Sequence, residues 1–128
     1  MLVKPLVIEC SMNNHHKINY IEIPVKDITA SKQFFPRVFA WQFVDYGEDY
    51  AGINDAGIAG GIFKSSATVS TAQGSVLLVI YSADLAASKS AIEQAGGKII
   101  KPIFSFPGGQ RFHFSDVNNN EYALWSDK

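Results

Sequence analysis

Two segments of the chain, residues 23–35 and 80–92, carry nearly the same sequence at a constant separation. The first reads IPVKDITASKQFF and the second IYSADLAASKSAI, and five of the thirteen aligned positions are identical at a separation of 57 residues (84 − 27, for example). In both segments the hydrophobic period changes from two to about 3.6 near the aspartate, which is typical of a strand followed by a helix. We therefore predict two copies of one supersecondary unit.

The length of the chain requires these two copies to share one hydrophobic core, because 128 residues are enough for one domain and too few for two. Hydrophobic residues make up 47% and charged residues 18%, with a formal net charge of −1, so neither disorder nor a nucleic-acid partner is expected. No apolar run is long enough to cross a bilayer, and the single Cys10 excludes an intramolecular disulfide. We expect a cytoplasmic protein that does not bind membranes.

The domain is expected to cover residues 18–126 and to consist of two repeats, residues 18–64 and 75–126, joined by a linker rich in Ser, Thr and Ala. In each repeat an aspartate, Asp27 or Asp84, precedes the helical pattern and is the expected N-cap. Residues 1–17 are either an N-terminal tail or an extra strand at the edge of the sheet.

Each repeat is expected to contain a strand, a helix and three further strands. The predicted strands cover residues 18–25, 41–46, 50–53, 58–63, 76–81, 98–106, 111–115 and 121–126. Gly60 and Gly61 lie inside one of these strands, where glycine is unfavourable. They therefore indicate either a β-bulge or a close approach by backbone or by a ligand.

This pattern resembles the vicinal oxygen chelate superfamily, which includes glyoxalase I, extradiol dioxygenases and the bleomycin and fosfomycin resistance proteins. The resemblance rests on the duplicated unit and on the phrases VKD, FPRVFAWQF, EQAGGKI and HFSDVNNNEYALW, the last of which is similar to the family's F-x-D-P-x-G-N-x-x-E-L-W. It implies an α+β fold in which two tandem βαβββ units form a cup-shaped, partly open mixed sheet with the helices outside. It also implies a ligand cavity inside the cup and a homodimer.

The resemblance further implies four positions for the ligands of one divalent metal ion. In this chain these positions are occupied by Tyr20, Leu77, Ala123 and one residue of 61–63, Gly-Ile-Phe. None of them has the carboxylate or imidazole group that usually replaces the water of a hard divalent ion. We therefore predict no metal at the usual place, no cofactor and no metal-dependent glyoxalase or dioxygenase chemistry.

Several polar residues are still expected to line the cup. Glu22 alternates with the apolar residues of the first strand, and it is either a general base or hydrogen-bond anchor, or a carboxylate that is solvated or paired with Arg111 or a lysine. Arg111 and His113 lie two positions apart and so face the same side of a strand. If that side lines the cup, Arg111 binds an anion and His113 transfers a proton; otherwise Phe112 and Phe114 line it.

The candidate catalytic residues of this site are therefore Glu22 and His113. The expected ligand-binding residues are Tyr20, Glu22, Phe63, Leu77, Arg111, His113 and Trp125. This set combines aromatic and apolar walls with a few polar anchors, which is the usual character of a small-molecule site.

Two main functional hypotheses follow. The first is a homodimeric protein of the glyoxalase and bleomycin-resistance type that binds a small molecule without the usual metal. The second is a metal-free or atypical isomerase or lyase, related to lactoylglutathione lyase, that acts on a small carbonyl compound with Glu22 or His113 as the base. A third hypothesis is a structural module whose cavity is filled by its own side chains.

Overall fold

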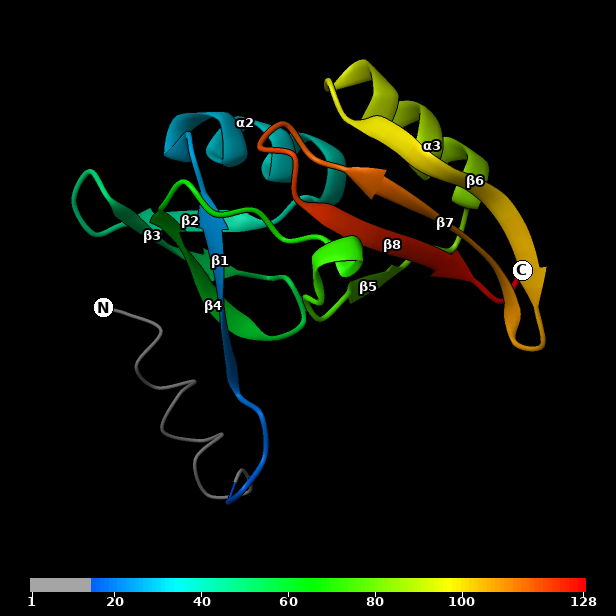
Figure 1. Ribbon diagram of the computed structural model, residues 1–128, viewed down its shortest axis with the longest axis horizontal. Coiled ribbons are helices and arrows are strands. Elements are labelled where there is room, and N and C mark those ends of the chain that lie inside the picture. Colours follow the sequence, from blue (N-terminus) through cyan, green and yellow to red (C-terminus); the bar gives the residue numbers. More distant parts are fainter. Residues whose placement is uncertain (1–14) are drawn as a thin grey trace.

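The computed structural model describes residues 15–128, which form two four-stranded sheets and two α-helices (Figure 1). The first repeat contains β1 (Tyr20–Val25), α2 (Ile28–Phe39), β2 (Gln42–Asp45), β3 (Tyr50–Asn54) and β4 (Ala59–Lys64). The second contains β5 (Leu78–Tyr81), α3 (Leu85–Gln94), β6 (Lys98–Phe106), β7 (Gly109–Ser115) and β8 (Glu121–Ser126). A short 3-10 helix, η1 (Thr71–Gln73), lies between the two repeats.

The two sheets have the same topology. Their strand orders are β1-β4-β3-β2 and β5-β8-β7-β6, and in each sheet the first strand of the repeat pairs in parallel with the last. The other neighbours are antiparallel. The predicted α+β fold, with two repeated βαβββ units and partly open mixed sheets, is therefore confirmed.

The two helices begin in the same way because each follows an aspartate cap. The side chain of Asp27 accepts a hydrogen bond from the backbone N–H of Ala30, and that of Asp84 accepts one from Ala87, both at 3.1 Å. Such a bond satisfies one of the backbone N–H groups that a helix N-terminus leaves without a partner. The two repeats thus share the same cap hydrogen bond as well as a similar sequence.

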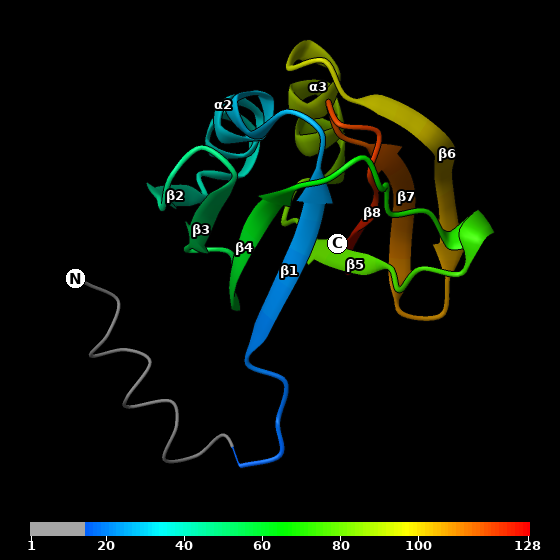
Figure 2. The same cartoon turned by 60° about the vertical axis from the view of Figure 1, so that its left-hand side comes forward.

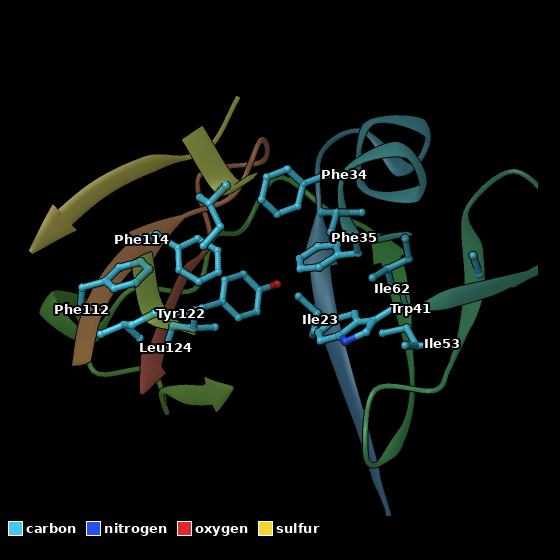
Figure 3. Close-up of a cluster of buried hydrophobic side chains, with 14 residues drawn as sticks. Ile23, Phe34, Phe35, Trp41, Ile53, Ile62, Phe112, Phe114, Tyr122 and Leu124 are labelled. Carbon is cyan, nitrogen blue, oxygen red and sulfur yellow. The ribbon is translucent and has the colours of Figure 1, made fainter. Parts of the chain in front are cut away.

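Both repeats contribute to one hydrophobic core between the sheets and the helices (Figure 3). The ring of Phe35, on α2, stacks on Trp41 with centroids 4.6 Å apart and meets the ring of Tyr122, on β8, at 5.5 Å. Phe34 similarly contacts Phe114 of the second repeat. Each such buried side chain stabilises the fold by about 1.5–3 kcal/mol. The core therefore contains side chains from both repeats.

Asparagine side chains of the β7–β8 turn also join the repeats. Asn118 donates from Nδ2 to the carbonyl oxygen of Asp27 (3.0 Å) and to Oγ of Ser31 (2.8 Å), and its Oδ1 accepts from the Asp27 N–H (2.8 Å). Asn120 donates to the carbonyl oxygen of Pro24 at 2.7 Å. These amides satisfy backbone groups at the end of β1 and the start of α2, so they fix the second repeat against the first.

The linker, residues 65–77, lies over one face of the second sheet (Figures 1 and 2). It is attached there by backbone bonding, because the N–H of Glu121 donates to the carbonyl oxygen of Val69 at 2.9 Å. In return, the N–H of Val69 donates to Oδ1 of Asn120 at 2.8 Å. The linker thus covers the start of β8 on the side away from the helices.

The predictions for residues 1–17 and for Cys10 fall wholly or mainly on residues 1–14, which lie outside the described range. Among residues 15–128, no helix combines the length and the apolar character that a membrane span requires.

Candidate functional site

Each sheet has one face in the core and one face directed away from the helices. On the first sheet, Ile23 and Val25 are buried, so Tyr20, Glu22 and Pro24 alternate with them on the opposite side. We call this side the first open face. On the second sheet the corresponding side, the second open face, carries Arg111, His113, Glu121, Ala123 and Trp125, while Phe112, Phe114, Tyr122 and Leu124 point into the core.

A chain of hydrogen bonds runs across the second open face. Nη2 of Arg111 lies 3.1 Å from Nε2 of His113, and Nδ1 of His113 lies 2.8 Å from Oε2 of Glu121. A guanidinium has only donors, so Nε2 must accept and the proton of the neutral imidazole must be on Nδ1, from which it bonds to Glu121. His113 therefore has both ring nitrogens engaged and orients Arg111.

The linker completes this chain. Oε1 of Glu121 accepts hydrogen bonds from the backbone N–H of Thr71 (2.8 Å) and from its hydroxyl (2.9 Å). Desolvation of Glu121 raises its pKa, but the hydrogen bonds from His113 and then from Thr71 outweigh this effect, so the pKa of Glu121 is lowered overall. His113 and Glu121 are consequently buried, at 6% and 9% exposure, although they lie on an open face.

Arg111 remains half-buried among aromatic rings. Its guanidinium carbon lies 5.5 Å from the ring centroid of Phe104, and Nζ of Lys101 lies 4.8 Å from the same centroid. Residues 101 and 104 of a regular strand would face opposite sides, but register shifts on both sides of Lys101 bring them opposite His113 and Arg111. Two cationic side chains therefore contact one ring on this face.

The positive charge of Arg111 is not neutralised by any residue of the range 15–128. Within residues 15–128 the ion pairs join Lys32 to Asp45, Lys89 to Glu93 and His113 to Glu121, and none includes Arg111. Its Nε is buried and has no hydrogen-bond partner in the same part of the chain. A half-buried guanidinium with free donors beside aromatic rings is a suitable receptor for a carboxylate, phosphate or phosphonate group.

The first open face carries a separate polar cluster formed by Tyr20, Glu22 and Tyr50. The hydroxyl groups of Tyr20 and Tyr50 are in contact, and Tyr50 donates to Oε2 of Glu22 at 3.1 Å. A Cβ atom on Gly61 would lie 2.0 Å from the Tyr50 hydroxyl, so this group lies directly over the glycine. The predicted close approach of backbone is confirmed at Gly60, where a Cβ atom would lie 2.6 Å from the carbonyl oxygen of Ile21, whereas a side chain approaches Gly61; the strand pairing of β4 shows no bulge.

The predicted site residues thus divide into two groups that no hydrogen bond joins within the described chain. Arg111, His113 and Trp125 share the second open face, which is the first of the two orientations considered; the alternative, with Phe112 and Phe114 lining the site, is wrong because both are fully buried. Trp125 packs there against Tyr81 and Phe106, at 5.2 and 6.2 Å between centroids.

Tyr20 and Glu22 lie on the first open face, and Glu22 bonds to Tyr50 and forms no ion pair with Arg111 or with a lysine of residues 15–128. Phe63 is half-buried on the same sheet, opposite Pro24 and Tyr50. Leu77 is half-buried in the linker, directly before β5.

Three residues of these clusters were not predicted. Glu121 lies two positions before Ala123 on the same strand, so the strand period alone could have placed it on the open face. Tyr50 and Thr71 gave no such signal, because their positions depend on how a side chain leans over Gly61 and on the path of the linker.

The residues at the four family metal positions do not fit a divalent ion. The phenol of Tyr20 is bonded to Tyr50, Gly61 has no side chain and is covered by Tyr50, Leu77 is apolar, and Ala123 is a buried methyl group opposite His113. Across residues 15–128, no three His, Cys, Asp or Glu side chains are grouped so that they could hold a metal ion.

Comparison with known proteins gives a family match over most of the chain. The family model described as the glyoxalase/bleomycin resistance protein/dioxygenase superfamily matches residues 17–124. No curated protein sequence matches the chain.

Solved structures show the same fold at low sequence identity. A glyoxalase-related enzyme from Fulvimarina pelagi is 17% identical, with a TM-score of 0.71 over 86% of this chain and 87% of that one. TioX from Micromonospora sp. ML1 is 18% identical, with a TM-score of 0.65 over 86% and 98%. A mutant of the fosfomycin resistance protein FosX from Listeria monocytogenes, complexed with Mn(II) and 1S,2S-dihydroxypropylphosphonic acid, is 19% identical, with a TM-score of 0.69 over 84% and 87%.

Proposed function

This chain belongs to the glyoxalase/bleomycin resistance protein/dioxygenase superfamily, and on that premise we propose that it binds a small organic anion on the second open face. The observation that carries the proposal is the free charge of Arg111. The guanidinium is oriented by His113, lies beside Phe104 and has no carboxylate partner within residues 15–128. A carboxylate, phosphate or phosphonate would accept its remaining hydrogen bonds.

The surroundings of Arg111 favour an anion with an aromatic or apolar body. Trp125 lies directly opposite Arg111 on the neighbouring strand, and Phe104 is opposite it on the other side. A charge-assisted hydrogen bond is worth about 1.5–3 kcal/mol, and burial of an apolar group against the rings adds to this. The phosphonate in the FosX complex is also a small organic anion, although the low identity extends only the fold to this chain.

We also infer that this binding does not use a metal ion at the family's usual position. The inference is supported by the donor chemistry there, since a phenol engaged with another phenol, a leucine, an alanine and a glycine replace the expected ligands. Elemental analysis of the purified protein should find no stoichiometric Zn, Ni, Mn or Fe. One tightly bound ion per chain would overturn the inference.

An isomerase or lyase acting on a small carbonyl compound is the second candidate function. His113 is better suited to position Arg111 than to act as a base, because Nε2 accepts from Arg111 and Nδ1 donates to Glu121. Glu22 is exposed and stays the candidate base. Loss of turnover in Glu22→Gln with unchanged ligand affinity would support the enzyme, whereas turnover that survives this substitution would exclude Glu22 as its base.

Exposed apolar residues support the proposed homodimer. Val79 and Tyr81 of β5 are 46% and 47% exposed on the second sheet. A second copy that covered these residues would remove them from water. Light scattering at micromolar concentration should give twice the monomer mass, and a monomer would contradict the proposal. A cytoplasmic location stays a prediction.

Calorimetric titration with benzoate and phenylphosphonate tests anion binding. We expect both to bind and Arg111→Gln to weaken them at least tenfold, which is the effect of losing about 1.5–3 kcal/mol. The matched control is Arg37→Gln, because Arg37 is the chain's other arginine and is exposed on α2. Equal affinities for the two variants, or no binding of either anion by the wild type, would refute the proposal.

A further inference from the structure

We propose that the first open face is a second binding site, specific for an organic ammonium group, formed by Tyr20, Glu22 and Tyr50. The site is on the other sheet from Arg111, and the inference does not depend on anion binding there. It follows from the direction of the hydrogen bonds, from the charge of Glu22 and from the position of two tyrosine rings.

The hydrogen bonds leave this cluster able only to accept. Tyr50 has one hydroxyl proton and donates it to Glu22, so in its contact with Tyr20 it must accept. The single proton of Tyr20 is then used as well. What remains are lone pairs on the Tyr20 hydroxyl and the free oxygen of Glu22, so a complementary ligand must supply N–H or O–H groups.

The negative charge of Glu22 favours a cation among such ligands. No lysine or arginine nitrogen lies within 4.0 Å of the Glu22 carboxylate in the range 15–128, and Glu22 is exposed. The three oxygen-bearing side chains include only one carboxylate, whereas Ca²⁺ takes six to eight oxygen ligands. An ammonium group, with a compact charge and up to three N–H donors, fits this small acceptor set better than a metal ion.

Tyrosine rings border the cluster. The ring centroids of Tyr46 and Tyr50 are 6.3 Å apart at an interplanar angle of 53°, and Tyr46 is 56% exposed. The face of an aromatic ring attracts a cation within about 6 Å of its centroid. The ligand's charge can therefore contact a ring while its N–H groups bond to the oxygens.

Two glycines leave the space that these rings occupy before any ligand binds. Gly52 and Gly61 are paired across β3 and β4. A Cβ atom on Gly52 would lie 3.1 Å from the ring of Tyr46, and the Tyr50 hydroxyl lies in the same way over Gly61. Partial burial, and then the hydrogen bonds to Tyr20 and Glu22, raise the pKa of Tyr50, so its proton is retained at neutral pH. The acceptor arrangement is therefore preorganised.

The probes for this site are benzylammonium, benzyltrimethylammonium and benzyl alcohol, titrated into full-length protein by calorimetry. We expect benzylammonium to bind at least tenfold more tightly than the other two, because only it combines a positive charge with N–H donors. Equal binding of the quaternary ion would overturn the proposed role of the acceptor oxygens. Absence of benzylammonium binding would overturn the site.

Two variants locate the binding. Glu22→Gln should weaken benzylammonium about tenfold, while Glu93→Gln, at an exposed acid on α3, should not change it. Gly61→Ala should weaken it to a similar extent, because the new methyl group displaces the Tyr50 hydroxyl while all three binding side chains are kept. If Gly61→Ala fails to fold, Glu22→Gln decides, and an unchanged affinity there overturns the proposal. Arg111→Gln should affect benzoate and not benzylammonium, so failure of either site is recognised separately.

Discussion

Replacement of Asp116 by Asn should make the stability of this protein markedly less dependent on pH. Asp116 is 2% exposed, and its Oδ1 accepts from the N–H groups of Asn118 (2.8 Å) and Asn120 (2.9 Å). Burial is the largest influence on this carboxyl group and raises its pKa from 3.8 to about 6, although the two backbone bonds and Tyr122 oppose the rise. Ionisation is therefore less favourable in the folded protein than in the unfolded chain.

The magnitude follows from this pKa difference. One pKa unit corresponds to about 1.4 kcal/mol, so a rise from 3.8 to about 6 means that ionised Asp116 destabilises the folded state by about 3 kcal/mol. The sign is that of a raised pKa: the penalty is absent below pH 3.8, grows as the pH rises, and is complete above about pH 6. Asparagine keeps the Oδ1 acceptor and does not titrate, so it avoids the penalty.

Urea unfolding at pH 4 and at pH 7.5, followed by the fluorescence of the buried Trp41, measures this effect. The free energy of unfolding of Asp116→Asn minus that of the wild type should be about 2–3 kcal/mol larger at pH 7.5 than at pH 4. Asp55→Asn is the control, because Asp55 is exposed and its positive φ suits asparagine. A difference between Asp116→Asn and wild type that does not change with pH would refute the reasoning.

Three further substitutions test other contacts. Asn118→Ala removes three hydrogen bonds that hold the β7–β8 turn against the start of α2, and it should lower the free energy of unfolding by about 2–4 kcal/mol in urea titrations. Glu121→Gln places an amide against the donors of His113 and Thr71, so it should weaken benzoate binding in calorimetry. It should also remove a stabilisation that the wild type loses as the pH falls through the lowered pKa of Glu121. Asp84→Ala removes the cap of α3 and should lower the melting temperature by an amount equivalent to about 1 kcal/mol; an unchanged melting temperature would contradict that role.

The fold was predictable because its information is local and repeated. The caps at Asp27 and Asp84 follow from short sequence patterns, and both begin helices as expected. Strand alternation also placed Arg111 on the opposite side of its strand from Phe112 and Phe114, although it left open which side faces the core; in the structure the two phenylalanines are buried and Arg111 is not. These properties depend on neighbours within a few residues, which a sequence displays directly.

The site was less predictable because its contacts join distant residues. Thr71 meets Glu121 across 50 positions, and Tyr20 meets Tyr50 across 30, so neither contact has a local pattern. The residues expected in a single site lie in two clusters on different sheets, because no local pattern indicates which distant residues come together. Gly60 and Gly61 did indicate a close approach in advance, because an unfavourable glycine in a strand requires a spatial explanation.

The parallel pairing of the first and last strands of each repeat has a consequence for biosynthesis. Tyr20 pairs with Ala59, and Leu78 with Tyr122, so neither sheet can close until the ribosome has released the final strand of that repeat. Until then both edges of β1 and of β5 lack a partner strand, and other nascent chains can join them. Such long-range closure also slows folding. We therefore expect a chaperone that binds the nascent chain to reduce its aggregation when the protein is made in quantity.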